Sequence, residues 1–69
     1  MEYQDAVDVH GSIREMLGKR NPNIVMISID NIEGEYGVLI GAINTEEVDV
    51  PKELDGVPIR VIQHHTYVE

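Results

Sequence analysis

The sequence contains no cysteine, no tryptophan and no phenylalanine. Without cysteine the chain forms neither disulfides nor thiolate zinc sites, which commonly reinforce small domains. Tyrosine is the only aromatic residue, so the core must be built from aliphatic side chains. The 69 residues predict one small domain, residues 1–69, with a thin margin of stability. We therefore expect reinforcement from a protein partner or from self-association.

Basic residues are also scarce, with 5 lysines and arginines against 13 acidic residues, for a net charge of -8. Such a charge repels phosphate backbones and anionic membrane surfaces, so we expect no nucleic-acid or membrane partner. No apolar run approaches the roughly 20 residues that cross a bilayer, and residues 1–5 lack the basic and apolar parts of a signal peptide. These features predict a cytoplasmic protein.

Helical periodicity is confined to the N-terminal segment. Its apolar residues form one stripe at 3.6 residues per turn: Ala6, Val9, Ile13, Met16 and Leu17. The pattern predicts an amphipathic helix from about Ala6 to Leu17, followed by a stop at Gly18. Gly11 lies inside this pattern, and Ser12 with Glu15 resembles a capping box. A helix that breaks at Gly11 is the alternative.

Apolar, β-branched runs further along the chain predict strands. The expected strands are Ile24 to Ile29, Tyr36 to Ile43 and Val57 to Gln63. Residues 30–35 are short and polar, which predicts a hairpin between the first two strands.

The acidic stretch 44–56 is expected to form a loop with one helical turn between Pro51 and Gly56, and residues 64–69 a flexible tail. The predicted fold is α+β: one N-terminal helix on a small, mainly antiparallel three-stranded sheet. Its order is helix, strand, strand, acidic helical turn, strand.

Three segments carry a family resemblance: NPNIVMISI at residues 21–29, GVLI at 37–40 and VPKELDGVPIRV at 50–61. Their order resembles the small α+β leader region that precedes bacterial trypsin-like protease domains. The resemblance implies a similar fold. It carries over no catalytic residue, because the matching residues are turn and core formers.

Histidine is the most reactive side chain present. His64 and His65, with His10 elsewhere, are candidate metal ligands, but adjacent residues in a strand point to opposite faces. Ser12 is interpreted as a cap and Ser28 lies inside a predicted strand, so neither is a convincing nucleophile. We expect no catalytic residue, no cofactor and no metal site.

The functional prediction rests on the first two predicted strands, which are apolar on both pleat faces. One helix covers only part of one face, so something else must cover the remainder. We therefore predict a non-catalytic protein-interaction or assembly module. The expected interaction surface comprises Leu39, Ile40, Ile59 and Val61. The alternatives are a metal-binding accessory domain that uses His64 and His65, and a small enzyme whose site forms only between chains.

Overall fold

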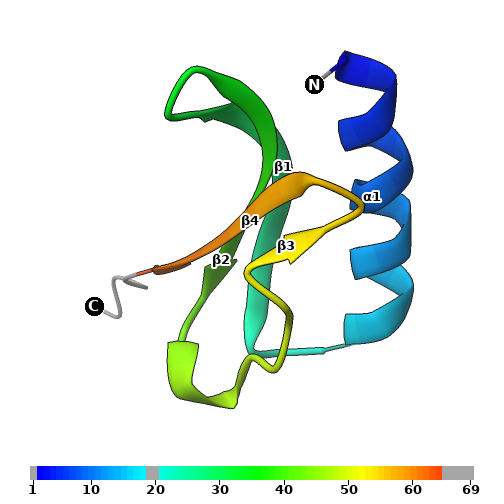
Figure 1. Ribbon diagram of the computed structural model, residues 1–69. Coiled ribbons are helices and arrows are strands. Elements are labelled where there is room, and N and C mark those ends of the chain that lie inside the picture. The colour runs from blue at the N-terminus through cyan, green and yellow to red at the C-terminus, as the bar shows by residue number, and fades with distance from the viewer. Residues whose placement is uncertain (1, 19–20, 65–69) are drawn as a thin grey trace.

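The computed structural model describes residues 2–18 and 21–64. It is an α+β fold in which one helix packs on one face of a four-stranded sheet (Figure 1). The elements in chain order are α1 (Tyr3–Leu17), β1 (Ile24–Ile32), β2 (Glu35–Ala42), the 3-10 helix η1 (Thr45–Glu47), β3 (Glu53–Leu54) and β4 (Val57–Gln63).

The helix α1 forms without a break, which settles the alternative at Gly11. Its buried residues are Ala6, Val9 and Ile13, which follow the predicted stripe. Gly11 is exposed with nothing near it, and the Ser12 hydroxyl donates to the Asp8 carbonyl oxygen at 3.2 Å inside the helix. Ser12 is therefore not a cap.

The sheet is mixed and has the strand order β1-β2-β4-β3. The β1–β2 hairpin is antiparallel as predicted, but β2 and β4 are parallel, and the short β3 pairs antiparallel with β4. The prediction of three mainly antiparallel strands was wrong on this point. A parallel neighbour requires the chain to return to the starting end of β2, and residues 43–56 make that crossover.

The acidic stretch also differs from its prediction. Its helical turn is η1, capped by the Asn44 side chain, and lies before Pro51 instead of after it. Asp55 and Gly56 both have positive φ, 50° and 81°, and join β3 to β4 as a two-residue hairpin turn. Gly56 therefore closes a hairpin and does not stop a helix.

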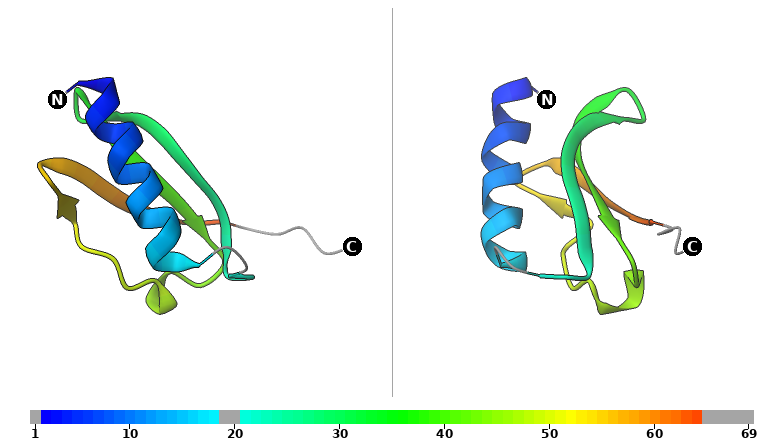
Figure 2. Two further views of the ribbon diagram at one scale, coloured as in Figure 1. Left: turned by 90° about the vertical axis from the view of Figure 1, so that its right-hand side faces the viewer. Right: turned by 180° about the vertical axis from the view of Figure 1, so that it is seen from behind.

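The two faces of the sheet differ in their cover (Figure 2). The side chains that face α1 form the core, and those buried or packed there include Val38, Ile40, Val57, Ile59 and Val61. The opposite face, called here the uncovered face, is defined by alternation and register; its residues include Met26, Ser28, Asp30, Leu39, Arg60 and Ile62.

Candidate functional site

The four residues predicted as an interaction surface do not share one face. Ile40 is fully buried and Ile59 is 7% exposed, both in the core against α1. Val61 is partly buried and packs against the same core. Only Leu39 lies on the uncovered face, where it is half-buried. Neighbouring strand residues point to opposite faces, so Leu39 and Ile40 cannot serve one surface, and the surface as predicted needs correction.

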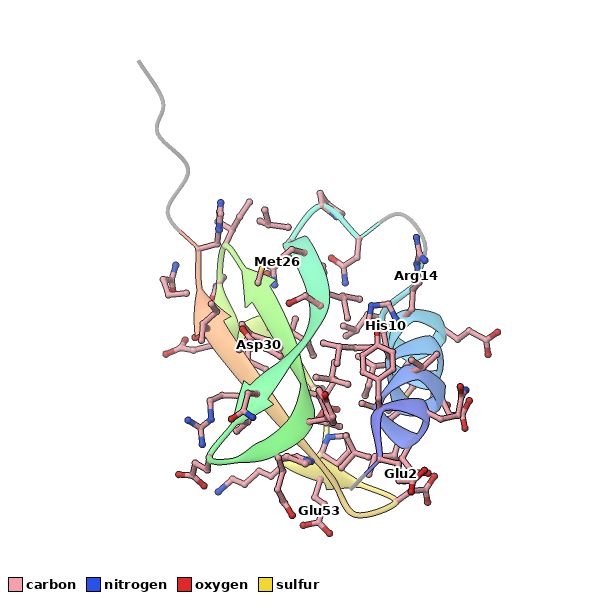
Figure 3. All side chains as sticks on the ribbon, turned by 90° about the horizontal axis from the view of Figure 1, so that it is seen from above. Glu2, His10, Arg14, Met26, Asp30 and Glu53 are labelled. Carbon is pink, nitrogen blue, oxygen red and sulfur yellow. The ribbon has the colours of Figure 1, made fainter. Side chains whose placement is uncertain are left out.

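The uncovered face carries an apolar patch of different composition. The register places Met26 beside Gly41 and Gly41 beside Ile62, while Leu39 occupies the next row of β2. Ile62 is 39% exposed, and Met26 and Leu39 are half-buried. We call Met26, Leu39 and Ile62 the apolar patch. Met26 and Asp30 lie on the sheet away from α1 in Figure 3.

Two glycines of β2 also face this side, but the protein itself fills the space above them. A Cβ at Gly37 would lie 2.7 Å from Ile32 Cδ1 and 2.8 Å from the Pro58 carbonyl oxygen. A Cβ at Gly41 would lie 2.9 Å from Met26 Cγ. The glycines therefore admit internal side chains and do not mark a vacant place for a partner.

The outer edge of β4 is covered only at its start. β3 pairs with Val57 and Pro58, and the Ile59 N–H donates to the Lys52 carbonyl oxygen at 2.9 Å. Beyond Ile59, no strand among residues 2–18 and 21–64 lies along this edge. We call the outer side of residues 60–64 the free β4 edge.

Backbone directions along this edge follow from two hydrogen bonds. The His64 N–H donates to the Ala42 carbonyl oxygen of β2 at 2.7 Å, so residues 60, 62 and 64 direct their backbone groups toward β2. The Ile59 N–H points away from β2, so the backbone N–H and C=O groups of Val61 and Gln63 also point outward, away from β2. His64, predicted to begin a tail, thus continues the ladder with β2, while residues 65–69 lie outside the described residues.

The opposite edge of the sheet, along β1, is covered in part by α1. His10 Nε2 lies 3.0 Å from the Ile27 carbonyl oxygen. A carbonyl oxygen only accepts, so the imidazole donates from Nε2. His10, interpreted from sequence as a candidate ligand, therefore covers the backbone of an edge strand.

An open hollow of about 330 Å³ lies beside this contact, between α1 and the start of β1. His10 and Arg14 line it, together with Asn21 and residues 24–27. Figure 3 labels His10 and Arg14 on α1. Its lining contains no carboxylate and no hydroxyl group. The hollow therefore offers no nucleophile and no acid–base pair for hydrolytic chemistry.

Metal ligands are not gathered in the described part of the chain. No group of three or more histidine or acidic side chains there is placed to hold a metal ion. His10 and His64 belong to opposite edges of the sheet, and His65 lies outside the described residues. The one ion pair among the described side chains joins Arg60 to Glu33 at 3.5 Å, with both side chains more than half exposed.

Comparisons with protein-family models, curated proteins and solved structures find no match. The resemblance to the protease leader region therefore remains a prediction. Within the described residues, no helix is long and apolar enough to span a membrane.

Ile62 and Met26 are the site residues that the sequence prediction missed. Strict alternation in β4 separates Ile62 from the core positions Ile59 and Val61, and this signal is present in the sequence. Met26 carries no such signal, because a register shift between Ile24 and Met26 resets the alternation of β1.

Proposed function

We propose that the protein is a non-catalytic protein-interaction module that binds a strand of its partner along the free β4 edge. The observation that carries this proposal is that the backbone N–H and C=O groups of Val61 and Gln63 point outward, beyond the end of β3. An edge with unpaired N–H and C=O groups is a template for strand addition.

The apolar patch supports the same edge. Ile62 belongs to β4 itself, and Leu39 and Met26 lie on the next two strands of the same face. A strand added beside β4 brings its own side chains onto this face next to Ile62. Backbone hydrogen bonds would then supply affinity, and the contact with Ile62 would supply selectivity.

The edge of β1 is a weaker candidate for strand addition. The His10 imidazole already occupies the Ile27 carbonyl oxygen, and α1 lies along this side. An incoming strand would have to displace this hydrogen bond. Within residues 2–18 and 21–64 the two edges therefore differ in access, and β4 is the open one.

The test uses a photo-cross-linking amino acid at Arg60, with Glu15 on the exposed side of α1 as the control position. In the source cell we expect adducts at position 60 and none at position 15. The same experiment is repeated in a Gln63→Pro background. This change removes one outward N–H and leaves the bonds to β2 in place, so adducts at position 60 should disappear.

Gln63→Ala is the matched control, because it shortens the same side chain and keeps the N–H. It should retain the adducts at position 60. Adducts that persist in Gln63→Pro, or that form equally at position 15, would contradict strand addition at this edge.

A further inference from the structure

The free β4 edge has a defined length. β3 and the Lys52 carbonyl oxygen occupy the outer side of β4 as far as Ile59, so an added strand has access only from Arg60 onward. His64 is the last described residue, and its N–H still donates to the Ala42 carbonyl oxygen of β2. The span open to a partner within the described residues is therefore 60–64, and Ile62 is its midpoint.

Backbone directions limit how two such spans can pair. In an antiparallel ladder, residues that face outward exchange hydrogen bonds with outward-facing residues of the other strand. The backbone groups of Val61 and Gln63 point outward. Each of these residues can therefore form a hydrogen-bonded pair with Val61 or Gln63 of an identical strand. A two-fold arrangement centred on Ile62 pairs Val61 with Gln63 of the second copy and uses all of residues 60–64.

A neighbouring register is less compatible with the structure. Centring the pair on Val61 places Gln63 of the second copy opposite Ile59. The Ile59 N–H already donates to the Lys52 carbonyl oxygen, and β3 lies directly alongside. The Ile62-centred register avoids this collision.

Side chains in that register are compatible as well. The Ile62 side chains of both copies meet on the uncovered face in a non-hydrogen-bonded pair, where cross-strand side chains approach most closely. Ile62 is 39% exposed and available for this contact. Arg60 lies opposite His64 of the second copy, and residues 57–64 include no acidic side chain. The acidic residues of the protein are therefore absent from the paired segment itself, and the nearest carboxylate, Glu33, is paired with Arg60.

From these observations we infer that the partner at the free β4 edge is a second copy of this chain, paired antiparallel about Ile62. This inference rests on the proposed function. The pairing joins two sheets into one continuous sheet and brings the two apolar patches together on its uncovered face. Each copy carries a net charge of -8, so mutual repulsion weakens the dimer, and salt strengthens it by screening.

The absence of cysteine makes a disulfide test of the register clean. In the Ile62-centred pair the two positions 62 lie within disulfide reach, so Ile62→Cys under mild oxidation should form a covalent dimer. Met16→Cys is the control, because Met16 is 56% exposed but lies on α1. We expect about tenfold more dimer from Ile62→Cys than from Met16→Cys.

The register has its own control. Arg60→Cys alone should link poorly, since position 60 faces position 64. A mixture of Arg60→Cys and His64→Cys should give a covalent heterodimer. Equal self-linking at positions 60 and 62, or no excess at position 62 over position 16, would overturn the Ile62-centred dimer.

Sedimentation equilibrium of the unmodified protein provides an independent measurement. Dimerisation should be detectable at high micromolar concentration and tighten about fivefold as ionic strength rises from about 0.05 to about 0.5 M. Gln63→Pro should abolish it and Gln63→Ala should retain it. A strict monomer overturns the second-copy assignment. If adducts to another protein at position 60 still depend on the Gln63 N–H, the proposed function survives that result; if they do not, both fail.

Discussion

The two faces of the sheet share one strand, β2, yet they have different roles. Val38, Ile40 and Ala42 point toward α1 and are fully buried. Leu39, between them, points to the uncovered face and is only half-buried. An apolar run that looks uniform in sequence is therefore divided by the pleat into residues that hold the fold and a residue available for contact. Burial against α1 stabilises the domain. On the other face Ile32 and Gly37 are also enclosed, and the positions that can change at small cost are Leu39 and Ile62.

The largest expected effect compares Ile40 with Leu39, neighbours on opposite faces. Ile40→Ala removes a fully buried side chain and should lower the free energy of unfolding by about 2–5 kcal/mol. Leu39→Ala should cost about 1 kcal/mol, because Leu39 lies on the face without α1 and part of its surface is already accessible to water. Urea denaturation followed by circular dichroism measures both values.

Ile40→Ala is a severe change for a domain of this size and can prevent folding. Ile40→Val, with an expected loss of about 0.5–1.5 kcal/mol, keeps the comparison measurable. Equal losses for Ile40→Val and a Leu39→Val variant would show that the two faces are buried alike, contrary to the structure.

A second, smaller effect concerns the two glycines on the uncovered face. Gly37→Ala places its methyl group against the Pro58 backbone oxygen, which has little freedom to move, and should cost about 1–3 kcal/mol. Gly41→Ala meets the Met26 side chain, which is flexible and can rotate away, so its cost should be smaller. Thermal melting of both variants measures the difference. A larger loss for Gly41→Ala would mean that Met26 is held rigidly.

The sequence predicted the elements better than their pairing. The stripe Ala6, Val9 and Ile13 has the period of a helix, and a short polar link at residues 30–35 between two apolar runs predicted a hairpin. Both features are local, so the residues concerned contain the whole signal. The link became the two-residue turn Glu33 and Gly34, with positive φ at both positions.

The strand order depended on a turn that was misinterpreted. Asp55-Gly56 between apolar residues is a strong hairpin signal, and its interpretation as a helix stop concealed β3. The parallel pairing of β2 with β4 has no local signal, since it depends on where the crossover 43–56 places the returning chain. Sequence periodicity contains no such long-range information.

For the candidate site, too, the sequence indicated the element involved but not the side chains that share one face. Pro58, near the start of the third predicted strand, favours an edge position because proline donates no ladder hydrogen bond, and among the described residues β4 beyond Ile59 does lie at an open edge of the sheet. The choice of side chains failed because the prediction joined Leu39 and Ile40, which alternate, and chose Ile59 and Val61 without Ile62. Packing decides whether the odd-numbered or the even-numbered residues of a strand face the helix. Periodicity alone does not determine this choice.

The smallest expected effect is at Ile62, and it depends on protein concentration. Ile62→Thr keeps a β-branched side chain on a strand and removes apolar surface that is partly in water, so the isolated chain should change in stability by no more than about 0.5 kcal/mol. Pairing about Ile62 would stabilise the native state of the parent by mass action as concentration rises. Melting temperatures of parent and variant should therefore coincide in dilute solution and separate in concentrated solution, with the parent higher. Met16→Ala, an uncharged change at a position of α1 that is 56% exposed, is the control and should leave the concentration dependence of the parent unchanged. A loss above about 1.5 kcal/mol in dilute solution would place Ile62 among the residues that hold the fold, and the distinction between the two faces would then fail at this position.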